Sequence, residues 1–203
     1  MWEPTAERAQ ATAMHRFMQA TGHDDYDALY QWSVSDSPAF WESLCEFCDV
    51  RFDSKADTIL TRPDNIMDAG WFAGSQLNYA AHLLRHDGEE AAIIFVGEDG
   101  TRRELSRDEL RTQVAAIAAG LRAAGVSKGD RVGGFLPNCP EAVIAMLATT
   151  SLGAIWSSCS PDFGVNGVVD RFGQIEPKVL FAVNGYFYNG KTCDTRPTIE
   201  GVV

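Results

Sequence analysis

Three residue pairs in this sequence have types and spacings that could do chemistry. Cys45 and Cys48 are separated by two residues, as metal-binding and redox cysteines often are. No second Cys or His pair stands at ligand spacing, so we interpret both thiols as residues packed on a helical face. His82 and His86 lie four residues apart on a predicted helix, but no third ligand is evident. The sequence therefore predicts no metal site.

The third pair consists of two carboxylates, Asp162 and Asp170, which as neighbours could do general acid and base work. Asp162 precedes a predicted helix, and we interpret it as the cap of that helix. Asp170 is followed by Arg171, and we expect its carboxylate to face solvent or to pair with that guanidinium. We therefore assign no catalytic role to either carboxylate.

A different kind of candidate is Trp156-Ser157-Ser158, an aromatic residue followed by two hydroxyl residues at the end of a predicted strand. It could form the wall of a ligand site, or Trp156 could be ordinary packing at a strand end. The surrounding chain alternates between apolar strands and helices, which is typical of strands that pair in parallel. The predicted strands are 131–136, 154–157 and 178–182, and the predicted helices between them are 141–152 and 166–175.

Ligands of open parallel sheets lie beyond the carboxyl ends of the strands. This edge is expected to contain residues 137–138, 157–162 and 183–191. An Asn-Gly turn precedes Lys191 in the last of these segments. Beyond Lys191 the chain becomes polar, and we predict no further helix or strand there.

The segments before this unit are predicted to be mostly helical. Ser106 with Glu109, and Asn138 with Glu141, match a capping box, and Ser37 is expected to cap another helix. The predicted helices are 5–20, 26–32, 39–48, 78–86 and one from Ser106 to Gly125, and a hairpin joins 91–97 to 101–105. The fold class is therefore α/β: a parallel, doubly wound sheet segment with an N-terminal helical extension. We expect the extension to cover residues 1–70 and an incomplete α/β domain to cover residues 71–203.

The composition narrows the class of protein. The net charge of -11 argues against nonspecific binding to nucleic acid or to an anionic membrane. The five cysteines have no framework spacing and favour free thiols in a reducing cytoplasm. No apolar run approaches the roughly 20 residues that span a bilayer, and the N-terminus lacks the layout of a signal peptide.

Several short motifs resemble the N-terminal part of the adenylate-forming acyl-CoA synthetase superfamily, and the resemblance covers nearly the whole chain. Motifs shared by many members are Gly129-Asp130-Arg131-Val132 and Leu136-Pro137-Asn138, and Trp2-Glu3-Pro4 is a further mark. Two further motifs are specific to fewer members: Ser160-Pro-Asp-Phe-Gly-Val-Asn-Gly167 and Tyr188-Asn-Gly-Lys191. They favour acetoacetate over acetate or propionate as the acid.

The resemblance implies a ligase of lipid metabolism that uses ATP, Mg²⁺ and CoA and releases AMP and pyrophosphate. Such enzymes hold the ATP phosphates with a Ser/Thr/Gly-rich loop that ends in lysine, and this sequence contains no such loop. We therefore expect the chain alone to be inactive and to hold none of these cofactors tightly. Two interpretations stay open: a fragment of the ligase, or a stand-alone module that binds CoA or a protein.

The resemblance also implies site residues on the CoA side. Trp156-Ser157-Ser158 matches a loop that lies along the pantetheine arm. Tyr188 and Lys191 match positions that hold the 3′-phosphoadenosine; Lys191 keeps a charge for a phosphate, and the Tyr188 ring could stack on adenine.

An incomplete parallel sheet has one further consequence. Such sheets are normally covered on both faces, so a sheet that stops mid-domain exposes apolar surface. A patch larger than a few hundred Å² favours association. We therefore expect the chain alone to form a dimer or a larger species.

Overall fold

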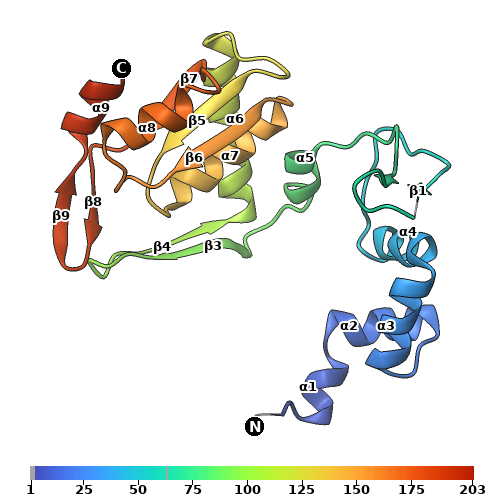
Figure 1. Ribbon diagram of the computed structural model, residues 1–203. Coiled ribbons are helices and arrows are strands. Elements are labelled where there is room, and N and C mark those ends of the chain that lie inside the picture. The colour runs from blue at the N-terminus through green and yellow to red at the C-terminus, as the bar shows by residue number, and fades with distance from the viewer. Residues whose placement is uncertain (1–2, 63) are drawn as a thin grey trace. The chain divides into compact units, whose positions relative to one another are not determined.

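The computed structural model describes residues 3–62 and 64–203, so Trp2 lies outside the described residues. The chain forms two compact units, one up to Leu77 and the other from Asn78 onward, and each has its own interior (Figure 1). The boundary expected after residue 70 stays a prediction.

The first unit consists mainly of four helices that enclose an aromatic cluster. Phe17 is buried at its centre, and its ring lies 5.1 Å from the Phe47 ring and 5.9 Å from the Phe40 ring. Two short antiparallel strands follow in an otherwise irregular segment. The elements are α1 (Ala6–Gln10), α2 (Ala13–Thr21), α3 (Tyr26–Ser35), α4 (Ser37–Phe47), β1 (Leu60–Thr61) and β2 (Gly70–Trp71).

Two expectations for these helices are wrong. The single helix 5–20 is broken, because the Thr12 hydroxyl accepts a hydrogen bond from the His15 N–H at 3.2 Å and caps a new helix there. Ser37 does not cap α4, since its hydroxyl donates to the Ser33 carbonyl at 2.8 Å. The Asp36 carboxylate caps α4 instead.

The second unit is built on a three-stranded parallel sheet with β5 in the middle. The strand order is β6-β5-β7, so the chain passes from β5 to β6 on one side and then returns past β5 to β7. These opposite crossovers place the connecting helices on opposite faces of the sheet (Figure 1). The predicted α/β class is confirmed, with β5 (Arg131–Phe135), α7 (Pro140–Ser151), β6 (Ile155–Cys159), α8 (Val165–Phe172) and β7 (Val179–Ala182).

Each face of the sheet has its own hydrophobic core, because successive side chains of a strand point to opposite faces. Val132 of β5 is fully buried against side chains of α6 and α7. Phe135, on the other face, is 1% exposed and packs with Val168 and Phe172 of α8. The two cores fix β5 from both sides.

The elements before the sheet largely match the sequence. Ser106 and Glu109 form the predicted capping box, and the predicted hairpin is present as an antiparallel pair. The helix expected to reach His86 ends at Leu83, because the Arg85 guanidinium donates to the His82 carbonyl at 2.8 Å and takes an acceptor that a longer helix needs. The elements are α5 (Tyr79–Leu83), β3 (Ala91–Val96), β4 (Arg102–Ser106) and α6 (Arg107–Ala123).

The expectation of no further element beyond Lys191 is wrong. Asn189 and Gly190 have φ of 50° and 71°, the conformation of a two-residue hairpin turn, and the polar segment after them pairs as a strand. The Thr195 hydroxyl donates to the Val183 carbonyl and ties the hairpin to the end of β7. The elements are β8 (Gly185–Tyr188), β9 (Lys191–Asp194) and α9 (Arg196–Val202).

An ionic contact fixes the amino ends of β5 and β7. Asp130 accepts a hydrogen bond from the Lys178 ammonium at 2.9 Å and another from the Ser127 N–H at 2.7 Å. The Lys178 contact is the main reason that the pKa of Asp130 falls from 3.8 to about 2. The folded pKa lies below the unfolded one, so the carboxylate stabilises the fold above the unfolded pKa and this contribution is lost as the pH falls through about 2.

We predict that Asp130→Asn lowers the thermal midpoint at neutral pH, and that the difference from the wild type closes as the pH falls from about 4 to about 2. Asp170→Asn, on the exposed side of α8, is the control and should leave the thermal midpoint at neutral pH nearly unchanged. Melting curves followed by circular dichroism over this pH range measure the thermal midpoints of the wild type and of both variants. A gap for Asp130→Asn that stays constant would contradict the role of this contact.

Two glycines offer a matched test of the packing. A Cβ on Gly134 of β5 would lie 2.5 Å from the Trp156 ring, whereas a Cβ on Gly120 of α6 would meet no atom within 4 Å. Gly134→Ala should therefore lower the free energy of unfolding by about 1–3 kcal/mol. Gly120→Ala should raise it by about 0.5–1 kcal/mol, because alanine favours a helix over glycine. Urea titrations measure both, and equal effects of the two changes would refute the account.

Candidate functional site

The first three candidate residues lie on β6, an edge strand of the sheet. Ser157 pairs with Gly133 and Ser158 with Gly134 in the parallel register. Since neighbouring side chains alternate between faces, Ser158 shares the α7 face with Trp156, and Ser157 points to the α8 face. The two hydroxyl groups therefore do not line one wall, and only Ser158 is exposed.

Trp156 is a packing residue in this structure. Its indole ring covers Gly134, joins the core on the α7 face and lies 6.1 Å from the Phe181 ring. Strand-end packing, one of the two alternatives considered for Trp156, is thus present. A ligand contact at Trp156, Ser157 or Ser158 stays a proposal.

The other two candidates, Tyr188 and Lys191, lie directly opposite each other on β8 and β9. The tight turn at Asn189–Gly190 enforces this register, and paired residues of a hairpin share one face. Both side chains are exposed, Tyr188 by 65%. The hairpin therefore presents one aromatic ring and one ammonium group side by side to solvent.

The carboxyl ends of β5 and β7 open into an apolar hollow of about 400 Å³, which we call the trough. Residues from α6, α7 and the strand ends line it, so no short sequence motif could reveal it. The lining residues are Gln113, Ala116, Ile117, Leu136, Glu141, Ile144, Ala145, Phe181, Ala182 and Val183.

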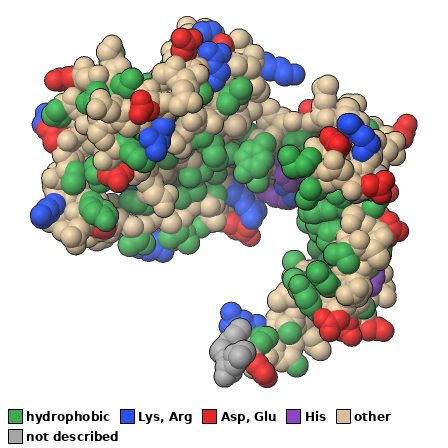
Figure 2. Space-filling model, in the orientation of Figure 1, with side chains coloured by type: hydrophobic (Ala, Val, Ile, Leu, Met, Phe, Trp, Pro, Cys, Tyr) green, Lys and Arg blue, Asp and Glu red, His purple; other side chains and the backbone are tan. Residues whose placement is uncertain are grey.

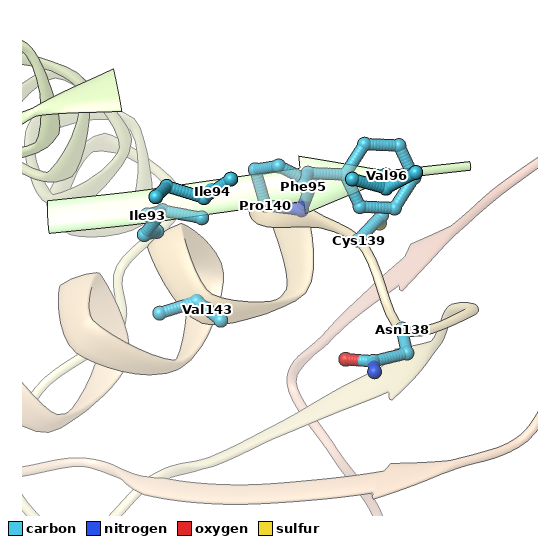
Figure 3. Close-up of a pocket in the computed structure, with 8 residues that line it drawn as sticks. All are labelled: Ile93, Ile94, Phe95, Val96, Asn138, Cys139, Pro140 and Val143. Carbon is cyan, nitrogen blue, oxygen red and sulfur yellow. The ribbon is translucent and has the colours of Figure 1, made fainter. Parts of the chain in front are cut away.

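A smaller pocket of about 260 Å³ lies between β3 and the start of α7 (Figure 3). Apolar side chains of β3, among them Ile94 and Val96, line it with Pro140 and Val143. Asn138 and Cys139 come from the loop after β5. Burial raises the pKa of the Cys139 thiol, which disfavours the nucleophilic thiolate. The fraction of Cys139 present as thiolate at neutral pH is therefore lowered.

Two predicted helix caps near this edge are wrong. The residue at the cap position of α7 is Cys139, whose side chain makes no capping hydrogen bond, so Asn138 stands one residue too early. The Glu141 carboxylate instead forms an ion pair with the Arg103 guanidinium, with 2.7 Å between the nitrogen and the oxygen. Asp162 does not cap α8, which begins after Gly164 without a side-chain bond. Neither α7 nor α8 therefore has the side-chain cap that the sequence predicts at its first turn.

The pairs that suggested metal, redox or acid–base chemistry do not form a site. His86 lies beyond the end of α5, so it does not share a helical face with His82. The Arg171 guanidinium lies over the Phe163 ring, 3.9 Å from its centroid, and donates to the Gly167 carbonyl. Across residues 3–62 and 64–203, no group of three or more His, Cys, Asp or Glu side chains could hold a metal ion. Cys45 is half-buried in α4, and Cys48 is exposed at the end of that helix.

No helix in the described part of the chain combines the length and the apolar character needed to cross a membrane. Hydrophobic side chains nevertheless reach the surface on the face drawn in Figure 2. Ile94, Val96 and Ile155 are each more than half exposed in the second unit.

Comparison with known proteins gives consistent results for both units. The model of the AMP-binding enzyme family matches residues 81–202, and that of the acetyl-coenzyme A synthetase N-terminus matches residues 26–83. An acetoacetyl-coenzyme A synthetase of Rhizobium meliloti (strain 1021) is 44% identical over an alignment of 208 positions. The alignment covers 100% of this chain and 32% of the relative. The acetoacetyl-CoA synthetase of Rattus norvegicus is 47% identical, and the match covers 94% of this chain and 30% of the length of that relative.

A solved structure shows the same fold. The acetoacetyl-CoA synthetase from Streptomyces lividans superposes with a TM-score of 0.89 at 44% identity, over 99% of this chain and 32% of that chain. The chain described here thus spans about a third of the length of the relatives it matches.

Proposed function

We propose, from the premise that the chain belongs to the AMP-binding enzyme family, that it forms the N-terminal part of a ligase that joins acetoacetate to CoA. In this reaction the carboxylate of acetoacetate attacks the α-phosphate of ATP and releases pyrophosphate. The CoA thiolate then displaces AMP from the acyl-adenylate to form the thioester. ATP, Mg²⁺ and CoA act in the whole enzyme, and none is held tightly by this chain.

One observation carries the proposal. Nearly every residue of this chain has a counterpart in a solved acetoacetyl-CoA synthetase that is 44% identical, with a TM-score of 0.89. Likeness at this level extends through both units and includes the β8–β9 hairpin, because the match covers 99% of the chain. Acetate or propionate as the acid is the alternative within the same reaction, and assays of the whole enzyme with the three acids distinguish them.

The chain by itself does not supply the chemistry. None of the described residues that line the trough is a lysine or an arginine. The trough therefore has no cationic group that could hold the ATP phosphates. The sequence also lacks a Ser/Thr/Gly-rich loop that ends in lysine. Adenylation and thioester formation are therefore assigned to the whole enzyme, of which this chain is one part.

The contribution proposed for this chain is a contact with CoA at the β8–β9 hairpin. Its exposed ring and ammonium group lie on one face and suit the adenine and the 3′-phosphate of CoA. Ser158 and the rim of β6 are proposed to lie along the pantetheine arm. Trp156 shapes this rim through its packing on the sheet.

A second candidate function is a stand-alone module that binds CoA or a protein. It is favoured by the two hydrophobic cores that the second unit forms without any other chain. Saturable CoA binding without catalysis supports the module and does not by itself exclude the ligase. The five cysteines, which have no framework spacing, fit the cytoplasm as the proposed compartment for either function.

The proposal predicts that the 203-residue chain, given ATP, Mg²⁺, acetoacetate and CoA, forms no acetoacetyl-CoA and releases no pyrophosphate above a blank. The Rattus norvegicus relative, assayed in the same buffer, is the positive control. Thioester absorbance and a coupled pyrophosphate assay provide the two readouts. Turnover by the chain alone would show that the catalytic groups lie within it.

The proposed CoA contact predicts that Lys191→Ala weakens CoA binding about tenfold, which equals about 1.4 kcal/mol. The lost interaction is a charge-assisted contact with a phosphate group. Lys128→Ala removes an exposed lysine at the amino end of β5 and should leave the affinity unchanged. Calorimetric titration measures both variants, and equal affinities for Lys191→Ala and the wild type would contradict the contact.

A further inference from the structure

The dipeptide Asn-Gly occurs three times in the second unit, each time in a different backbone setting. The sites are 166–167, 184–185 and 189–190, and the residue before the asparagine is valine at the first two and tyrosine at the third. Asn-Gly is the sequence in which a main-chain nitrogen most easily reaches the side chain before it, because glycine has no Cβ to block the approach. The three sites therefore share one reaction, and the backbone decides which of them can use it.

Asn166-Gly167 is held inside α8. The Gly167 carbonyl accepts a hydrogen bond from the Arg171 guanidinium at 2.9 Å. A Cβ on Gly167 would lie 3.3 Å from the Phe163 ring, so the backbone is closely packed there. In a helix each side chain also leans toward the preceding turn, away from the nitrogen of the next residue. The helix thus keeps the two reacting atoms of this site apart.

Asn184-Gly185 is held at the start of β8. The Asn184 carbonyl accepts a hydrogen bond from the Thr195 N–H at 3.2 Å, and Gly185 pairs with Asp194 of β9. A Cβ on Gly185 would lie 2.8 Å from the Cys193 carbonyl oxygen, so the neighbouring strand crowds this glycine. Strand pairing therefore fixes the backbone of the second site as well.

Asn189-Gly190 is the exposed tip of the β8–β9 hairpin. No hydrogen bond joins the Asn189 side-chain amide or the Gly190 N–H to another described residue. Strand pairing stops at Tyr188 and Lys191, so among the described residues only the turn itself restrains the tip. Such a tip opens locally at little cost in free energy, unlike a packed helix or a paired strand. Local opening brings the Gly190 nitrogen to the Asn189 side chain.

We propose that Asn189 is a site of spontaneous deamidation. The Gly190 nitrogen attacks the side-chain amide carbon of Asn189, a C–N bond forms, and the bond from that carbon to Nδ2 breaks. Nδ2 leaves as ammonia with the proton that the Gly190 nitrogen gives up through solvent. Water then opens the cyclic imide at either carbonyl and leaves aspartate or isoaspartate. The sum is hydrolysis of the side-chain amide: water is consumed, ammonia is released, and no atom changes its oxidation state.

Deamidation changes the face proposed to hold CoA, and this consequence rests on the proposed function. Either product places a carboxylate in the turn beside Lys191, where it repels the phosphate groups of CoA. Isoaspartate also routes the main chain through the side-chain carbons, which lengthens the tight turn and shifts Tyr188 out of register with Lys191. The hairpin therefore loses affinity for CoA as the protein ages.

The test is incubation of the 203-residue chain at mildly alkaline pH, followed by tandem mass spectrometry of its peptides. Exchange of NH2 for OH raises the mass of a modified asparagine, so the same sample reports all three sites. Asn189 should react about tenfold faster than Asn166 or Asn184 in the folded chain, and the three rates should converge in urea, where the backbone settings are lost. Equal rates in the folded chain, a faster reaction at another site, or a preference that persists in urea would each overturn the proposal.

Two variants connect the modification to CoA. Asn189→Gly keeps a residue that this turn accepts and removes the reactive amide, and Asn189→Asp carries the added charge from the start. In calorimetric titrations the CoA affinity should fall with incubation in the wild type, stay constant over time in Asn189→Gly, and be about threefold weaker in Asn189→Asp than in the fresh wild type.

The two parts of the inference fail separately. A wild-type affinity that stays constant while Asn189 is deamidated would contradict the consequence for CoA. No saturable binding of CoA by the fresh wild type would contradict the proposed CoA contact and leave the modification site standing, because mass spectrometry alone decides that site.

Discussion

The second unit depends on the burial of β5 between two hydrophobic cores. Its central residues, Gly133 and Gly134, have no side chains, so large neighbours lie directly on the strand. A Cβ on Gly133 would be 3.1 Å from Leu180, and one on Gly134 would be 2.5 Å from the Trp156 ring. β5 is thereby held against β6 on one side and β7 on the other, and the positions of both strands determine where the carboxyl edge and its hollow lie.

This packing separates the parts of the candidate site. The Trp156 ring packs on the sheet. Because side chains along β6 alternate between the two faces, Ser158 lies on the same face as Trp156, and its hydroxyl is exposed. The exposed charge and ring come from the β8–β9 hairpin, a separate antiparallel element that follows β7. The proposed CoA contacts thus rest on a strand of the sheet and a tight turn, and the trough lies apart from them between α6, α7 and the strand ends.

The sequence predicted well those features that local patterns determine. Apolar runs located the three parallel strands, and the Ser106–Glu109 capping box located the start of α6. Competing side-chain bonds explain several errors: Thr12 starts a second helix, and Asp36 replaces Ser37 as a cap. The β9 strand was missed because its polar residues are held by pairing with β8, which no single-segment pattern shows. The trough was beyond sequence reasoning for the same reason, since its lining comes from distant segments.

The central claim is that the burial of β5 between two hydrophobic cores holds the sheet together. Hydrogen–deuterium exchange of the main-chain amides tests it most directly, in the wild type and in Gly134→Ala. The account predicts slow exchange of the β5 amides in the wild type, and faster exchange of the same amides in Gly134→Ala, whose added Cβ displaces the Trp156 ring. Fast exchange of β5 in the wild type, or equal exchange in the two proteins, would contradict it.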